Sequence, residues 1–346
     1  MDRTDEPTVR PHVGRRKRAV PPVRYRTSLQ RGPRVALATS TTPTVRVVVT
    51  CSHRKNRPAP QRFQMRSVTG VRMATRLRRW TTHLSTSTAP AIAALDLYAG
   101  EHWGIARRLA QTSASHRPRV ELWVCSAGYG LIPVTAPIMP YAATFSPGSP
   151  DSVTGGASAW WAALADWEGP AGAPRRLTDL VTADPTGRLL VVLSGTYLRA
   201  CRDDLLRAVE GLSDTEQLSI LSAGSDPDPE LSAFLLPADA RLQAVVGGSL
   251  QALNIRIAQR LVAAGIVAHD AMHDELTKLL ADQRPLRRYD RRRVTDTEVR
   301  HFIREQRAVN ADASPTSLLR TFRETGNACE QGRFAAVFRA EVGGGQ

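Results

Sequence analysis

Short apolar runs alternate with amphipathic segments through the middle of the chain. The first run is the β-branched stretch at 45–50, and four more follow at 120–124, 189–193, 218–221 and 242–246. Segments with apolar residues at helical spacing lie between or after them, at 101–111, 157–167, 197–212 and 250–264. Short strands that alternate with helices indicate a parallel sheet covered on both faces. The sequence therefore predicts an α/β domain of Rossmann-like type at 45–267.

The end of the chain has a different pattern. Residues 284–343 contain three helix-length segments, the last two at 316–325 and 329–341. Ser314-Pro315 is a helix start signal, and Gly326-Asn327 is a tight turn of the kind that separates the helices of a helix-turn-helix. A small helical, possible helix-turn-helix domain is one interpretation. A helical bundle that only packs on the α/β body is the other.

Charge is concentrated at the front of the chain. Residues 1–80 hold 20 Lys and Arg against three acids, a net charge of +17, which leaves −2 of the total of +15 for residues 81–346. We expect residues 1–44, rich in Arg, Pro, Thr and Ser without apolar periodicity, to be a disordered basic extension. An Arg-rich insert with an amphipathic helix follows at 56–94. Such a basic N-terminal region attracts polyanions. A solvated extension without a partner would explain the same charge distribution equally well.

A second basic cluster precedes the C-terminal helices. Two separate basic segments without an amphipathic membrane anchor favour nucleic acid, and DNA in particular, over a membrane as partner. The candidate nucleic-acid contacts are Arg287, Arg288, Arg291, Arg292 and Arg333.

Several classes of protein are excluded as leading interpretations. No apolar run reaches the roughly 18 to 20 residues of a membrane helix, and no secretory h-region follows the N-terminal charges. The four cysteines are far apart and form no C-x-x-C pair, which argues against a disulfide framework or a cysteine zinc site. His269 and His273 have helical spacing but lack an H-E-x-x-H motif, so we expect no metal. A cytoplasmic protein is the expectation; the cofactor and the oligomeric state stay open.

Small and hydroxyl-bearing residues follow each predicted strand. In an open parallel sheet, ligands bind outside the carboxyl ends of the strands, where the strand order reverses. Ser194 and the run Gly247, Gly248 and Ser249 are therefore candidate ligand-binding residues, the run as a cradle for phosphate or carboxylate before a helix. It has neither the P-loop ending nor the G-x-G-x-x-G spacing, and a simple tight turn is the competing interpretation.

The densest group of reactive residues is Cys51-Ser52-His53-Arg54-Lys55, directly after the first strand. A thiol, a hydroxyl, an imidazole and two cations can bind phosphate or activate a nucleophile. Lys55 is one of three lysines in a chain that otherwise uses arginine, and an amine can lose its proton where a guanidinium cannot. Lys55, Cys51 and Ser52 are thus candidate catalytic residues. The alternative is a buried Cys51 followed by a solvated turn.

A second group follows the strand at 120–124. Ser126, Tyr129, Gly130 and Tyr141 are candidate ligand-binding residues, with the two rings stacking a base or sugar. A well-packed structural loop is the alternative.

These motifs, in this order, resemble those of YaaA-type peroxide-stress proteins and related bacterial domains. The order is Cys-Ser-x-x-Lys at 51–55, Leu-Tyr-Ala-Gly at 97–100, Ser-Ala-x-Tyr-Gly-Leu at 126–131 and Pro-Tyr at 140–141. The first motif also resembles the lysine-transferring domain of archaeosine synthase. The resemblance covers about 45–261 and implies a Rossmann-like body, association with nucleic acid or its bases, and a ligand site at Cys51, Ser52, Lys55, Ser126, Tyr129 and Tyr141.

Together these features predict a nucleic-acid-associated protein with a nucleotide- or nucleobase-binding crevice, acting in DNA modification, repair, stress response or phage defence. Whether it is an enzyme stays open. The alternatives are a non-catalytic DNA-binding protein with the α/β body as scaffold or sensor, and a small-molecule enzyme with no role on nucleic acid.

Overall fold

The structure is a computed structural model that describes residues 44–111, 118–224, 228–285 and 291–343. The predicted basic extension, apart from its last residue, lies outside the described residues. So do Arg287 and Arg288, two of the predicted nucleic-acid contacts.

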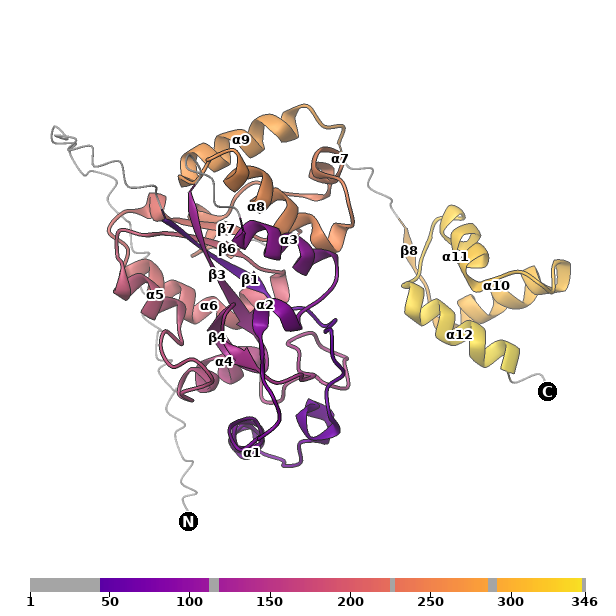
Figure 1. Cartoon of the computed structure of the whole chain (residues 1–346). Helices are drawn as coiled ribbons and strands as arrows, with labels where there is room; N and C mark the ends of the chain where they lie inside the picture. Colours follow the sequence, from indigo (N-terminus) through magenta and orange to yellow (C-terminus); the bar gives the residue numbers. More distant parts are fainter. Residues whose placement is uncertain (1–43, 112–117, 225–227, 286–290, 344–346) are drawn as a thin grey trace, which may run out of the picture. The chain divides into compact units, whose positions relative to one another are not determined.

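A five-stranded sheet forms the centre of the body (Figure 1). The strand order is β4-β3-β1-β6-β7, and all neighbours are parallel except β3 and β4, which form a hairpin. The bounds are β1 Thr44–Thr50, β3 Arg119–Ser126, β4 Gly130–Pro133, β6 Arg188–Val192 and β7 Leu218–Leu221. β1 is central and its valines are fully buried, as its continuous apolar run requires.

Helices flank this sheet (Figure 1). On one side α3 packs against α8, and on the other α6 packs against α4 and α5. Their bounds are α3 Glu101–Ala110, α4 Ala157–Ala165, α5 Leu177–Ala183, α6 Gly195–Glu210 and α8 Leu253–Ala263. α9, His269–Ala281, adds Met272 and Leu276 to the same hydrophobic core, beyond the predicted end of the domain at 267. The predicted α/β class, with a mostly parallel sheet between helices, is confirmed.

Shorter elements complete the body. They are α1 Met73–Ser85, α2 Ala94–Leu97 and α7 Gln243–Val246, the antiparallel pair β2 Ile92–Ala93 and β5 Pro137–Ile138, and the 3-10 turns Gln61–Phe63, Met65–Ser67, Thr215–Gln217, Ser232–Phe234, Ala240–Leu242 and Leu250–Ala252.

The Arg-rich insert is part of the core. The predicted amphipathic helix is α1, and its Trp80 is fully buried, with the indole N–H donating to the Gly128 carbonyl at 2.7 Å. Phe63 and Met65, from the same insert, are also fully buried. Arg78 and Arg79 stay exposed on α1, whereas Arg76 is half-buried and donates to the Met65 carbonyl at 2.8 Å. A basic segment can thus supply apolar side chains to a core.

One predicted strand is wrong. Residues 242–246 form the end of a 3-10 turn and the short helix α7. Asp239 accepts a hydrogen bond from the Arg241 amide and starts the helical turn, and Gly247, with a φ of +67°, ends it. A short apolar run does not by itself distinguish strand from helix, and these flanking residues decide it. The fifth strand is β4, an antiparallel edge that the sequence pattern did not predict.

Three helices follow near the end of the chain: α10 Asp296–Val309, α11 Pro315–Glu324 and α12 Gln331–Gly343. The start signal at Ser314 is confirmed, since its hydroxyl accepts a hydrogen bond from the Ser317 amide. The helices share a hydrophobic cluster of their own, which includes Ile303, Phe322 and Phe334. The two-residue segments β8 Arg292–Arg293 and β9 Asn327–Ala328 pair in parallel beside them.

Arg175 holds the hairpin and the neighbouring loops together. This buried guanidinium donates to the carbonyls of Tyr129 at 2.6 Å, Leu131 at 2.9 Å and Trp167 at 3.0 Å. Burial lowers the pKa of Arg175 to about 10, which still leaves it charged at neutral pH. A charged donor that satisfies several buried carbonyls is costly to remove, because each carbonyl then loses its partner in a site closed to water.

We therefore expect Arg175→Met to lower the free energy of unfolding by about 3 kcal/mol, measured by urea denaturation. The neighbouring Arg176 pairs with the exposed Asp166, so Arg176→Met should cost under about 1 kcal/mol. Equal losses in the two variants would contradict this role of Arg175.

Candidate functional site

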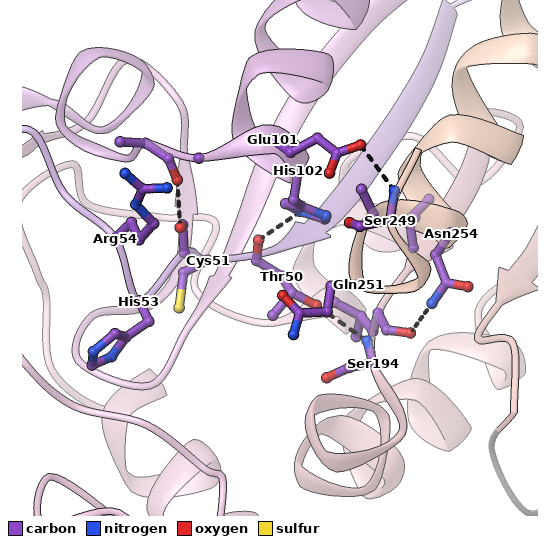
Figure 2. A pocket seen from close by; sticks show the side chains of 16 residues that line it. Thr50, Cys51, His53, Arg54, Glu101, His102, Ser194, Ser249, Gln251 and Asn254 are labelled. Atoms are coloured by element: carbon purple, nitrogen blue, oxygen red, sulfur yellow. Dashed lines mark hydrogen bonds between the residues drawn. The ribbon is translucent and has the colours of Figure 1, made fainter. Parts of the chain in front are cut away.

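A pocket of about 460 Å³ lies at the carboxyl ends of β1 and β6 (Figure 2). Its lining comes from four places in the chain: residues 50–54 after β1, 99–102 at the start of α3, 192–194 at the end of β6, and Ser249, Gln251, Ala252 and Asn254 before and within α8. The strand order reverses between β1 and β6, since the chain first passes from β1 to β3 on one side and then returns to β6 on the other. The pocket therefore lies where an open α/β sheet leaves a crevice.

Two long helices begin at this pocket without a side-chain cap. Gly100 is the N-cap residue of α3 and Ser194 that of α6, and both line the pocket. Gly100 has no side chain, and the Ser194 hydroxyl does not bond to its helix. The first amides of a helix have no partner within the helix and carry a partial positive charge. The arrangement is suited to an anion.

Two side chains fasten the strand ends that form the pocket. Asn254 accepts a hydrogen bond from the Ala223 amide at 2.9 Å and donates to the Leu193 carbonyl at 3.1 Å. Thr50 accepts a hydrogen bond from the Ser194 amide at 3.2 Å. Both residues were missed by sequence reasoning, because an Asn within a helix and a Thr at a strand end carry no distinctive pattern.

Glu101 occupies the turn that the sequence predicted as a phosphate cradle. Its carboxylate accepts from the Ser249 amide at 3.2 Å (Figure 2) and from Arg256 at 2.7 and 3.0 Å, and these bonds lower its pKa to about 2. A Cβ on Gly248 would collide with this pair, lying 2.1 Å from Arg256 Nε. The cradle interpretation of Gly247, Gly248 and Ser249 is therefore corrected: the turn follows a helix and wraps an internal ion pair, and of the three residues only Ser249 reaches the pocket.

His102 is held in one tautomer. Its Nε2 lies 3.2 Å from the Thr50 carbonyl (Figure 2), which can only accept, so the proton is on Nε2 and the Nδ1 of the neutral ring keeps its lone pair. Burial lowers the pKa of His102. The pocket therefore contains a neutral imidazole at neutral pH.

The predicted catalytic group is divided between the pocket and the core. Cys51 and Ser52 line the pocket; the Cys51 thiol lies 3.3 Å from the Tyr197 hydroxyl, and the Ser52 hydroxyl donates to the Ala99 carbonyl at 2.6 Å. Lys55 is not among the lining residues. Its amine donates to the Ser52 carbonyl at 3.1 Å and lies 4.3 Å from the centre of the Tyr141 ring.

Burial is the main reason that the pKa of the Lys55 amine is lowered, while Cys51 and Asp151 act in the opposite direction. Such an amine loses its proton more readily than an exposed one, which is what a nucleophilic role requires. The same contacts also fix the loop that carries Ser52 and His53.

The predicted base-stacking rings are buried in the core. The Tyr141 hydroxyl bonds to Ser126 at 2.7 Å and to Tyr98 at 2.8 Å, and the Tyr129 hydroxyl accepts from the Met139 amide. Ser126 also accepts from the Gly128 and Tyr129 amides, which builds the hairpin turn. Gly130 packs against Arg175. The prediction that these residues bind a ligand directly is corrected, because no face of either ring is open to the pocket.

Two of the predicted nucleic-acid contacts near the C-terminus already form ion pairs. Arg292 pairs with Glu298 and Arg333 with Asp296, and Arg291 is half-buried. Within the described ranges there is no group of three or more His, Cys, Asp or Glu side chains that could hold a metal, and no helix is long and apolar enough to span a membrane.

No family model, curated protein or solved structure matches this chain. The resemblance to YaaA-type proteins therefore stays a prediction from the motifs.

The buried imidazole gives a pH dependence. The pKa of His102 is lowered in the folded protein, whereas the unfolded chain keeps the ordinary value of 6.5. Below that pH the unfolded chain binds a proton at this ring and the folded protein does not, so acid favours unfolding. Stability should therefore fall as the pH drops through about 6.5, and His102→Gln should reduce that fall. Urea denaturation between about pH 7.5 and about pH 5.5 measures it.

Some loss should remain in the variant, since burial also lowers the pKa of His269. His301→Gln, which removes an exposed histidine on α10, is the control for the loss of a ring that is not buried. A profile unchanged by His102→Gln would show that this ring does not resist protonation.

Proposed function

We propose that the pocket binds a nucleotide through its phosphate groups and that the chain acts on or with nucleic acid. The observation that carries the proposal is the position of the pocket, between the ends of β1 and β6 where the strand order reverses and two uncapped helices begin. Its volume of about 460 Å³ is in the usual range for small-ligand sites.

The charges support an anionic ligand. Glu101 is neutralised by Arg256, whereas Arg54, at the exposed edge of the pocket, is in no ion pair within the part of the chain that the structure describes. Its guanidinium can form the two parallel hydrogen bonds that a phosphate accepts. The base would lie beside Ala99, a half-buried apolar residue of the lining, since the tyrosines are not part of that lining.

If the protein is an enzyme, three groups are placed for chemistry. Cys51 is the thiol in the pocket lining, His102 is a neutral base whose tautomer is fixed, and Lys55 is an amine with a lowered pKa behind the pocket wall. The processes named above, DNA modification, stress response or phage defence, stay predictions from the sequence.

The second candidate is a non-catalytic DNA-binding protein with the α/β body as scaffold. The observation in its favour is the separate hydrophobic cluster of α10, α11 and α12, which supports a helical domain at the end of the chain. Residues 325–330 connect α11 to α12, which is longer than the 3–4-residue turn of a helix-turn-helix. The connection includes Gly326, with a φ of +81°.

The nucleotide proposal predicts that a carboxylate in the pocket abolishes binding. In Ser194→Asp the new side chain can cap α6, so the fold is kept, but its charge occupies the place of the phosphate. We expect nucleoside monophosphates at 100 times their dissociation constant to stabilise the wild type by about 2.7 kcal/mol and to leave Ser194→Asp unchanged, measured by thermal unfolding.

Ser314→Asp makes the same exchange at the N-cap of α11 and is the matched control, which should respond to nucleotide like the wild type. If no nucleotide stabilises the wild type, the proposal for this pocket is wrong.

The two candidates differ at Lys55. Because Lys55 contacts only the body, Lys55→Ala should leave the affinity for duplex DNA within about twofold of the wild type at every salt concentration. Fluorescence anisotropy with duplex DNA, single-stranded DNA and RNA measures it. If turnover of a nucleotide is found, the variant should lose that turnover and keep the affinity, whereas a parallel loss of both would contradict this division of roles.

A further inference from the structure

A second pocket, of about 400 Å³, lies on the C-terminal helices beside the β8–β9 pair and the start of α12. Four arginines line it together with mostly small or apolar residues; they are Arg291, Arg293, Arg323 and Arg333. Like charges gather in one place only if other groups hold them there or if an anion joins them.

Two of these arginines are fixed by backbone carbonyls. Arg323 donates through Nε and Nη2 to the Cys329 carbonyl at 3.3 and 2.9 Å, which leaves its Nη1 hydrogens. Arg333 donates through Nη2 to the Val294 carbonyl at 2.9 Å and through Nε to Asp296. Both guanidinium groups are therefore held in position before any ligand arrives, which reduces the entropy that binding would cost.

Arg293 is exposed, and its side chain has no hydrogen bond or ion pair within the described residues. Its five N–H donors are open to a ligand. It follows Arg292, whose charge is already paired with Glu298.

Among the described residues, Glu330 is the only carboxylate in the lining, and it is occupied. Its two oxygens accept hydrogen bonds from the Gly332 amide at 2.8 Å and the Arg333 amide at 2.7 Å, at the first turn of α12. Arg333 is also paired with Asp296, which lies outside the lining, and the carboxylate of Glu330 is committed to the helix. In the neighbouring pocket, by contrast, two carboxylates, Glu298 and Glu305, face the single arginine Arg292.

We propose that the pocket formed by Arg291, Arg293, Arg323 and Arg333 binds a backbone phosphate of a nucleic acid. The inference rests on the nucleic-acid association proposed above and adds Arg293 and Arg323 to the candidate contacts. The planar fork of arginine suits the paired oxygens of a phosphate. Nucleic acid is favoured as the source because the chain carries further arginines at 284, 287 and 288 directly before the pocket. A contact to the backbone positions the nucleic acid but carries no sequence information.

The test compares two variants of the full chain that lose the same charge. Arg293→Gln removes the exposed pocket arginine, and Arg339→Gln removes an exposed arginine near the other end of α12 that donates only to its own helix. Binding to duplex DNA is measured by fluorescence anisotropy across salt concentrations. Loss of one phosphate contact should reduce the salt slope by about 0.9 and the affinity about eightfold at 0.1 M salt in Arg293→Gln, with little change in Arg339→Gln.

Inorganic phosphate is the second probe, in a thermal unfolding assay. It should stabilise the wild type and Arg339→Gln more than Arg293→Gln. Equal DNA affinities and slopes in the two variants would overturn this site while the nucleic-acid proposal stands; a wild type without salt-dependent DNA binding would overturn both. If phosphate distinguishes the variants but DNA does not, the pocket takes its phosphate from another source, such as a phosphopeptide, and the nucleic-acid assignment is wrong.

Discussion

The placement of β6 beside β1 is the constraint on which the rest of the body depends. After β1 the chain crosses to β3 and turns back through β4, so it can reach the free side of β1 only by passing over the sheet. The connections that leave β1 and β6 then run to opposite faces, with α3 after β1 and α6 after β6. Neither connection can cover the space between the two strand ends. The crevice is a result of topology before any side chain is considered.

Side chains hold the walls of that crevice in position and determine its charge. Asn254 ties the chain just beyond β6 to the chain just beyond β7, and Glu101 ties the start of α3 to the turn before α8. Both use neutral or internally compensated groups, so the walls add little net charge. The partial charges of two helix N-termini and the cation of Arg54 then dominate at the ligand's position, and this is the electrostatic reason for expecting an anion.

The sequence predicted the parts of the fold that depend on local pattern. The β-branched run of β1 and the apolar period of α6 identify those elements without tertiary information, and Ser314-Pro315 identifies the start of α11. The strand predicted at 242–246 is wrong because the run is short. The N-cap at Asp239 and the glycine at 247 favour a helical turn more than the two valines favour a strand. β4 was missed because Gly130–Pro133 is only four residues long and ends in proline, so it carries no strand pattern of its own.

The candidate site divides in the same way. Residues directly after a strand, Cys51, Ser52 and Ser194, reach the pocket because strand ends must meet at one edge of a parallel sheet. The direction of a side chain in a loop is not fixed by such a rule, and Tyr129 and Tyr141 turn inward instead. Their hydroxyls find partners in the core, which removes the usual reason for a tyrosine to stay at the surface. Tyr141 and Tyr98 form the aromatic surroundings of Lys55, so one of the two rings predicted to frame a base lies beside an amine. An ammonium group over an aromatic face is stabilised, but its separation from water favours the neutral form. Burial, which lowers the pKa of Lys55, is opposed by Cys51 and Asp151, so both the core and the pocket lining set how readily this amine gives up its proton.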